Sequence, residues 1–131
     1  MIRPAILVLI LASGCGGDET ISGYADRDTT WRLTELDGAA FPARATLRFP
    51  EEGQMSGSGP CNSFSAAQTA PYPWFESGPI AATRRACPEL QEEGAFFTAL
   101  GEMQIAEVSG SVLILSNEAG RSMVFEVDSA I

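Results

Sequence analysis

Ser56–Phe64 reads Ser-Gly-Ser-Gly-Pro-Cys-Asn-Ser-Phe, and a second short stretch, Ala82–Pro88, reads Ala-Thr-Arg-Arg-Ala-Cys-Pro. The glycines of the first stretch permit backbone conformations that are closed to other residues, and Pro60 stiffens the approach to Cys61. We therefore predict that the first stretch is a turn after a strand. The second stretch ends at Cys87, directly before the best helical pattern in the chain.

Cys61 and Cys87 are the only cysteines outside the N-terminal leader. We predict that they form a disulfide that ties the turn to the beginning of the helix. Closing a loop of about 26 residues stabilises a fold by roughly 3.5 kcal/mol in the chain-entropy model. The alternative is a redox or metal-binding pair, although a redox pair usually reads Cys-x-x-Cys and a metal site needs further ligands.

The composition excludes several classes of function. The chain has 131 residues, a formal charge of −9, no histidine, and only arginine as its basic residue type. An acidic chain lacks the basic face that nucleic-acid binding needs. Without His and Lys there is no Ser-His-Asp or Cys-His nucleophile, no His-based metal site and no Schiff base. The alternative is acid–base chemistry by a pair of carboxylates, although nothing in the sequence singles out such a pair. We therefore expect a protein that is not an enzyme, with no cofactor and no metal.

The N-terminus has the form of a secretory signal over residues 1–14. Arg3 supplies a minimal positive charge, Ala5–Ala12 is an unbroken apolar run, and small residues then precede Cys15. This pattern resembles the lipobox of bacterial lipoproteins, which implies that Cys15 is lipidated and anchors the chain to a membrane. We expect a periplasm-facing position in the bacterial cell envelope, with the outer membrane favoured over the inner one. The alternative is an ordinary signal peptide, with Cys15 incidental.

Residues 15–30 are polar and predict a flexible tether, followed by one domain over residues 31–128. Alternating apolar positions, as in Trp31–Leu36, predict strands. The expected strands are Trp31–Leu36, Ala45–Phe49, Gln54–Gly57, Ser63–Ala70, Ile80–Thr83, Glu102–Val108, Ser111–Ser116 and Arg121–Val127.

One helix is expected over Cys87–Leu100. Pro88 suits its first position, and Glu89, Glu92 and Glu93 follow near the N-terminus, where the helix dipole favours anions. An apolar stripe is expected at Leu90, Gly94, Phe97 and Leu100, and Phe96 and Ala99 widen it. This order of elements predicts an α+β fold: a curled antiparallel sheet or partial β-barrel of about seven to eight strands packed on one helix.

A family resemblance rests on several short motifs spread over most of the chain. The motifs are Trp31-x-Leu33, Ala45-x-Leu47-x-Phe49, Ser58-x-Pro60-Cys61-Asn62-x-Phe64, Ala82-Thr83-Arg84-x-Ala86-Cys87-Pro88 and Phe97-x-x-Leu100. They resemble the META/HslJ-like domain. The resemblance implies a compact β-rich domain with one helix, often in a lipoprotein of the bacterial envelope, and no established enzymatic activity. Some members look like a secretin pilot protein that holds acyl chains, which implies a hydrophobic cavity.

Within the two cysteine stretches, Asn62, Phe64, Thr83, Arg84 and Pro88 are interpreted as a structural motif. The Asn62 amide suits a turn because it bonds neighbouring backbone. Thr83 is expected to bond backbone near the turn. Arg84 is expected to pair with a carboxylate or to fix the turn through its carbonyl groups, and the alternative is an anion site formed with the next arginine.

Tyr72, Trp74 and Phe75 are the candidate binding surface, because aromatic residues beside prolines at a sheet edge resemble interaction anchors. The alternative is that one or two of them fold back onto the core.

These expectations combine into one functional hypothesis: a non-catalytic, lipid-anchored envelope protein that binds or stabilises an envelope component. The alternative is a carrier of a small apolar ligand or acyl chain in a partial-barrel cavity.

Overall fold

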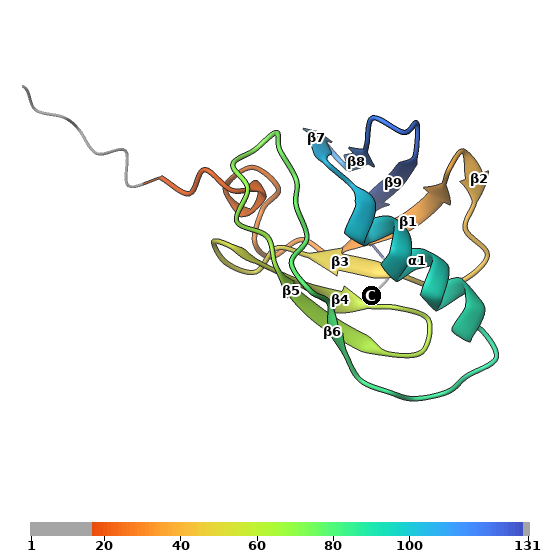
Figure 1. Ribbon diagram of the computed structural model, residues 1–131. Helices are drawn as coiled ribbons and strands as arrows, with labels where there is room; N and C mark the ends of the chain where they lie inside the picture. Colours follow the sequence, from red (N-terminus) through yellow and green to blue (C-terminus); the bar gives the residue numbers. More distant parts are fainter. Residues whose placement is uncertain (1–16, 130–131) are drawn as a thin grey trace, which may run out of the picture.

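The computed structural model describes residues 17–129, in which one helix and nine strands follow a short 3-10 turn (Figure 1). The predicted signal peptide and Cys15 lie outside the described residues. In chain order, the elements are η1 (Ile21–Gly23), β1 (Trp31–Leu36), β2 (Ala39–Ala40), β3 (Thr46–Arg48), β4 (Gln54–Ser58), β5 (Ser63–Ala67), β6 (Ala81–Ala82), α1 (Leu90–Glu102), β7 (Ile105–Ser109), β8 (Val112–Ser116) and β9 (Ser122–Val127).

The strands form one antiparallel sheet in the order β6-β5-β4-β3-β1-β9-β8-β7, with β2 paired to the far end of β1. The sheet curls without closing, because β6 and β7 remain at its two ends. Figure 1 shows α1 lying across the open side of the curl. The fold is therefore α+β with a curled sheet on one helix, as the sequence predicts.

Strand β1 joins the two halves of the sheet, since it pairs with β3 on one side and with β9 on the other. Its bounds agree with the sequence prediction, and the alternating Trp31 and Leu33 are buried. The additional strand is Ala39–Ala40, which pairs back onto β1 after a turn at Asp37 and Gly38, both with positive φ. A two-residue strand has too little alternation to be recognised from sequence.

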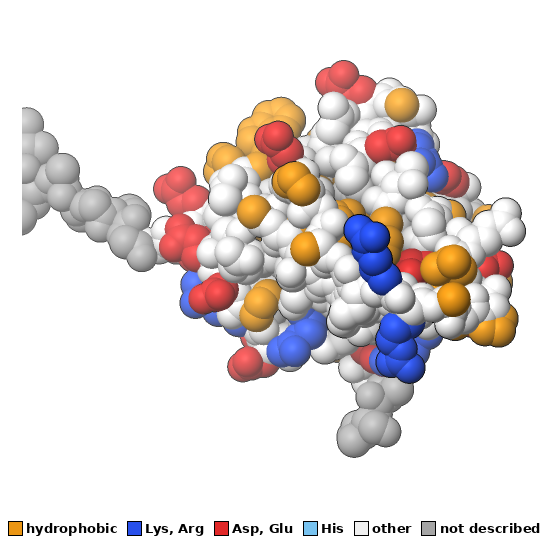
Figure 2. All heavy atoms as spheres, turned by 60° about the horizontal axis from the view of Figure 1, so that its bottom comes forward, with side chains coloured by type: hydrophobic (Ala, Val, Ile, Leu, Met, Phe, Trp, Pro, Cys, Tyr) orange, Lys and Arg blue, Asp and Glu red, His pale blue; other side chains and the backbone are white. Residues whose placement is uncertain are grey.

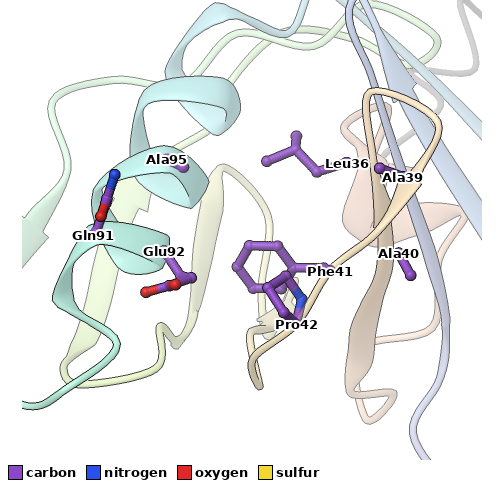
Figure 3. Close-up of a pocket in the computed structure, with 8 residues that line it drawn as sticks. All are labelled: Leu36, Ala39, Ala40, Phe41, Pro42, Gln91, Glu92 and Ala95. Atoms are coloured by element: carbon purple, nitrogen blue, oxygen red, sulfur yellow. The ribbon is translucent and has the colours of Figure 1, made fainter.

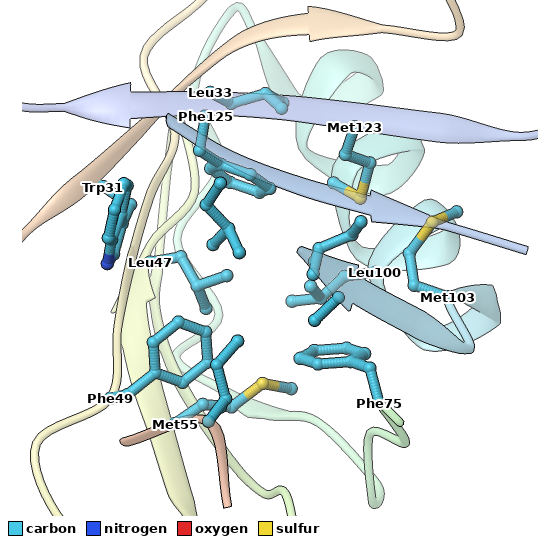
Figure 4. Packing of buried hydrophobic residues seen from close by; sticks show 14 of the residues in the cluster. Trp31, Leu33, Leu47, Phe49, Met55, Phe75, Leu100, Met103, Met123 and Phe125 are labelled. Atoms are coloured by element: carbon cyan, nitrogen blue, oxygen red, sulfur yellow. The ribbon is translucent and has the colours of Figure 1, made fainter. Parts of the chain in front are cut away.

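The interior of the curl is filled by apolar side chains from both halves of the sheet and from α1 (Figure 4). Phe64, one of the motif residues, packs edge-on against Phe96 and Phe97 of the helix, with ring centroids 5.6 and 5.2 Å apart. The largest fully buried side chains are Trp31, Phe49, Phe96, Phe125, Ile21, Leu33, Leu47, Met55, Leu100, Leu113, Leu115 and Met123.

The helix begins at Leu90, after Pro88, so Pro88 is not its first residue as predicted. The predicted apolar stripe is wrong at Leu90 and Gly94 and correct at Phe96, Ala99 and Leu100. Leu90 is 48% exposed and Gly94 is exposed, whereas the buried positions of α1 are Glu93, Phe96, Ala99 and Leu100. The spacing of apolar residues predicted that Leu90 would be buried. The first buried residue of the helix is instead Glu93, a carboxylate.

The predicted flexible tether is corrected by the structure, because part of it, around Thr20–Ala25, packs onto the domain. Ile21 is only 1% exposed and belongs to the core, together with Ala25. The Asp18 carboxylate accepts hydrogen bonds from the Thr20 N–H (2.9 Å) and from the Ser22 hydroxyl, which fold the segment into η1. The prediction failed because it rested on the polar composition of the segment as a whole. That average does not reveal two buried apolar residues or the local hydrogen bonds of Asp18.

Candidate functional site

The predicted disulfide is present. Cys61 lies in the turn between β4 and β5, Cys87 lies just before α1, and their Cα atoms are 5.6 Å apart. The turn itself is closed by the Gly59 N–H, which donates to the Asn62 carbonyl at 2.7 Å. We call this region the clasp: Gly59, Cys61, Asn62, Cys87 and Glu93.

Glu93 is the central residue of the clasp, and sequence reasoning assigned it only to the helix dipole. It is 3% exposed and lies beneath the turn. Its carboxylate accepts hydrogen bonds from the N–H groups of Cys61 (3.0 Å) and Asn62 (2.6 Å), and from the Asn62 side-chain amide (2.6 Å). A Cβ atom at Gly59 would lie 2.5 Å from Glu93 Oε1, so the turn needs glycine there.

Asn62 connects the turn to the segment before the helix. Its amide nitrogen donates to the Arg85 carbonyl at 2.9 Å, and its side-chain oxygen accepts from the Arg85 N–H at 2.5 Å and from the Thr83 hydroxyl at 2.9 Å. The predicted structural role fits these contacts. The partners differ from those predicted, because Asn62 bonds distant backbone and Thr83 bonds the Asn62 side chain. These protein contacts occupy both ends of the buried amide, so the arrangement is a structural one.

Arg84 does not act as predicted. It is exposed, and among residues 17–129 its side chain has no hydrogen bond or ion pair. The backbone of Arg85 supplies the link to the turn instead. Figure 2 shows acidic and basic side chains on the same face of the molecule, without a continuous basic stripe.

The three aromatic residues predicted as one surface separate in the structure. Phe75 is 2% exposed and lies in the core near Leu100 (Figure 4). Tyr72 is half-buried, and its hydroxyl accepts a hydrogen bond from the Val108 N–H at 2.9 Å. Trp74 remains 60% exposed. The alternative that one or two of them fold back onto the core is therefore correct, and Phe75 is excluded from the candidate surface.

Sequence reasoning missed Tyr24, which is 54% exposed and stacks on Tyr72 with ring centroids 4.4 Å apart. The loop that carries Tyr72 and Trp74 also covers the edge strand β7. The Ala106 N–H donates to the Pro73 carbonyl at 2.7 Å, and Trp74 forms an isolated bridge with Ile105.

A cleft of about 370 Å³ separates the β1–β2 hairpin from α1 (Figure 3). Leu36 and Phe41 lie on the hairpin side, and Ala95 and Glu92 lie on the helix side. Ala39, Ala40, Pro42 and Gln91 complete the lining. The walls are therefore mostly apolar, with Glu92 and Gln91 as the polar groups.

Two carboxyl groups outside the clasp have shifted pKa values. Burial alone would raise the pKa of Asp18, but hydrogen bonds from Ser22, Thr20 and Arg27 outweigh burial and hold that pKa below its ordinary value of 3.8. The pKa of Asp37 is also lowered from 3.8, chiefly by hydrogen bonds from Arg121. The Arg121 guanidinium lies 2.9 Å from Asp37 Oδ2.

Within residues 17–129, no group of three or more His, Cys, Asp or Glu side chains is placed to hold a metal ion. No helix in the same range combines the length and the apolar character needed to cross a bilayer.

Comparison with known proteins identifies the family. The model of the META domain matches residues 25–130. A search of curated proteins finds no match. Among solved structures, the chain is similar to a protein from Burkholderia xenovorans, with 24% identity, a TM-score of 0.64, and coverage of 79% of this chain and 83% of that one.

A second similar structure is a DUF4847 family protein from Bacteroides vulgatus, with 13% identity, a TM-score of 0.62, and coverage of 78% of this chain and 94% of that one. At these identities, the two structures agree with this chain in fold alone. The match of the family model covers most of the sequence, including the clasp, the loop that carries Tyr72 and Trp74, and the cleft. The chain therefore belongs to the META domain family.

Proposed function

We propose that this META domain protein is a non-catalytic, lipid-anchored component of the bacterial cell envelope that binds another envelope component through the cleft between the β1–β2 hairpin and α1. The observation that carries the proposal is the cleft itself. Apolar side chains, Leu36 and Phe41 among them, line this open hollow beside polar helix residues. Mostly apolar walls with a few polar groups are typical of binding sites.

Two features support the envelope location. The leader and Cys15 resemble those of a bacterial lipoprotein, and the Cys61–Cys87 disulfide is typical of proteins that reside in an oxidising compartment. The absence of His and Lys, together with the closed hydrogen bonding of the clasp, supports a function without catalysis.

The alternative is a carrier of a small apolar ligand or acyl chain. The apolar lining of the cleft favours it, since Phe41 and Ala95 could contact a hydrocarbon chain. The interior of the curled sheet is filled by core side chains. A carried ligand would therefore bind in the cleft and not inside the sheet.

The cleft can be tested with a variant that blocks it. Ala95 is an exposed helix residue, so Ala95→Arg should fold normally while placing a charged side chain across the opening. Ala119→Arg adds the same charge in the exposed turn before β9 and is the matched control. Wild-type protein and both variants would be used to capture partners from envelope extract. A partner that is lost with Ala95→Arg and retained with Ala119→Arg supports the proposal, and equal capture by both variants overturns it.

Native mass spectrometry of the purified protein distinguishes the carrier alternative. An apolar adduct that is present in the wild type and absent from Ala95→Arg would favour a carrier. The anchor is tested separately by palmitate labelling in the producing cells: the label should be lost in Cys15→Ser, and labelling that survives this change would refute the anchor.

A further inference from the structure

An exposed group of aromatic side chains lies where the N-terminal segment joins the domain. We call Tyr24, Tyr72, Trp74 and Ile105 the aromatic edge. Tyr24 and Trp74 are among the most exposed large apolar side chains of the described residues, and Ile105 adds a third at 37%. Tyr24 stacks on Tyr72, and Trp74 pairs with Ile105, so the four residues come from the end of η1, the loop after β5, and β7.

Glu19 and Thr20, a few residues after Cys15 in the sequence, lie directly beside this edge. The Tyr72 N–H donates to the Glu19 carbonyl at 2.8 Å, and Thr20 forms a bridge with Pro71. Four peptide units separate Cys15 from Glu19, and an extended chain covers at most about 14 Å over that length. A lipid on Cys15 would therefore hold the aromatic edge close to the surface of its membrane. The short distance leaves little room for the domain to turn another face toward the bilayer.

The chemistry of the edge suits the headgroup layer of a bilayer. Tyr and Trp are enriched at membrane–water interfaces, where their rings contact hydrocarbon and their polar groups contact water. The exposed neighbours Glu19, Glu76 and Glu107 are acidic, and an anionic lipid surface would repel them. Zwitterionic phospholipid is therefore the surface that this edge matches. The lipid tether also raises the effective concentration, so a weak contact is enough to hold one orientation.

We propose that the aromatic edge lies in the headgroup layer of a zwitterionic phospholipid membrane and holds the anchored domain in one orientation. This inference rests on the lipid anchor put forward under the proposed function. Figure 1 shows the β1–β2 hairpin and the beginning of α1 on the opposite side of the domain from the N-terminal segment. The cleft then faces away from the membrane, toward partners in the aqueous phase.

The two tryptophans make the inference measurable. Trp74 is exposed, whereas Trp31 is 2% exposed and serves as an internal control. The full-length lipidated protein would be reconstituted in phosphatidylcholine vesicles that contain a headgroup-spin-labelled lipid. We expect the label to quench wild-type fluorescence and to leave the Trp31 signal of Trp74→Phe unchanged. The acrylamide quenching constant of Trp74 should fall by about two-fold or more on vesicles, compared with the same chain expressed from residue 16 onward, without leader or lipid, in solution.

Two variants test whether the edge acts as a surface. Tyr24→Ser should restore part of the acrylamide quenching of Trp74 on vesicles, because it removes an exposed ring from the same edge. Leu90→Ser removes an exposed apolar side chain from the beginning of α1, away from the aromatic edge. It should leave the acrylamide quenching of Trp74 on vesicles unchanged.

The outcomes separate the orientation from the anchor. One outcome is that the wild-type protein floats with vesicles while Trp74 stays as accessible to acrylamide as in solution. This result would overturn the orientation and leave the anchor intact. Protein that does not float refutes the anchor, and the orientation fails with it. Shielding of Trp74 that appears without vesicles and grows with protein concentration would identify a second copy as the occupant and would also overturn the proposal.

Discussion

At the residue scale, the clasp depends on one buried carboxylate. Glu93 accepts two backbone N–H groups and one side-chain amide, and all three donors come from the turn that contains Cys61. Hydrogen bonds to a charged group are stronger than neutral ones, and burial makes an unpaired donor costly. The sequence placed Glu93 in the right helix. It could not show that Asn62 and its turn would meet it, because the two lie 31 positions apart.

Glu93→Gln should therefore destabilise the domain. One carboxylate oxygen is replaced by an amide N–H₂ group, which confronts either the Asn62 amide or the backbone donors of the turn. We expect the free energy of unfolding in urea to fall by about 2 kcal/mol.

The neighbouring Glu92→Gln is the matched control, since Glu92 lines the cleft and is not part of the clasp. Its change should stay within about 0.5 kcal/mol. Equal urea midpoints for the two variants would show that the clasp contributes no stability through Glu93.

At the element scale, the structure changes the account of the N-terminal segment. A tether would tolerate substitution throughout, whereas η1 buries Ile21 in the core. The prediction was wrong here because one isoleucine among polar residues hardly changes the average hydropathy of the segment. Its burial follows from the packing of η1 against the rest of the domain.

Ile21→Ala should lower the free energy of unfolding by about 2–4 kcal/mol, as large-to-small changes in a core do. Asp28→Ala, at an exposed position in the same segment, is the control and should have little effect. Thermal and urea unfolding of both variants would check this. If neither variant changed the free energy of unfolding, the interpretation of this segment as a flexible tether would be correct.

The β1–β2 turn is held to β9 by the pair of Asp37 and Arg121, and this pair predicts a pH dependence. The pKa of Asp37 is lower in the folded chain than its ordinary value of 3.8. Its contribution to stability is therefore present above about pH 4 and is lost as the pH falls through the folded pKa. Asp37→Asn keeps a residue that tolerates positive φ and removes the charge.

We expect Asp37→Asn to be less stable than the wild type at neutral pH, with a difference that shrinks as the pH is lowered below 4. Urea midpoints measured from pH 7 to pH 2 would show this. Glu52→Gln, at an exposed site, should show no such convergence. A difference for Asp37→Asn that stays constant across the range would contradict the pair as its cause.

At the scale of the whole molecule, the disulfide connects the β4–β5 turn to the helix that covers the open curl. It closes a loop with a sequence separation of 26. The Cys61→Ser, Cys87→Ser double variant should lose about 3–4 kcal/mol, because the unfolded chain regains the entropy of that loop.

Reduction of the wild type should lower its urea midpoint toward that of the double variant, and the double variant itself should not respond to reductant. A wild-type midpoint that is unaffected by complete reduction would show that the clasp is held by hydrogen bonds alone.

The sequence by itself determined the features that local rules govern. Alternation in β1 and β9 set which side chains face inward, turn residues separated the strands, and the two cysteines after Cys15 indicated their pairing. These features depend on neighbours in the chain, so the α+β class and the family resemblance could be predicted.

Only the tertiary structure decided which residues of similar type are buried and which are exposed. Phe75 entered the core while Trp74 stayed outside, Leu90 was left exposed while Glu93 was buried, and Tyr24 joined Tyr72 from a segment that looked like a tether. The physical reason is the same in each case. Burial of an aromatic ring or a carboxylate is favourable only where distant segments supply matching contacts or donors, and sequence spacing does not encode those partners.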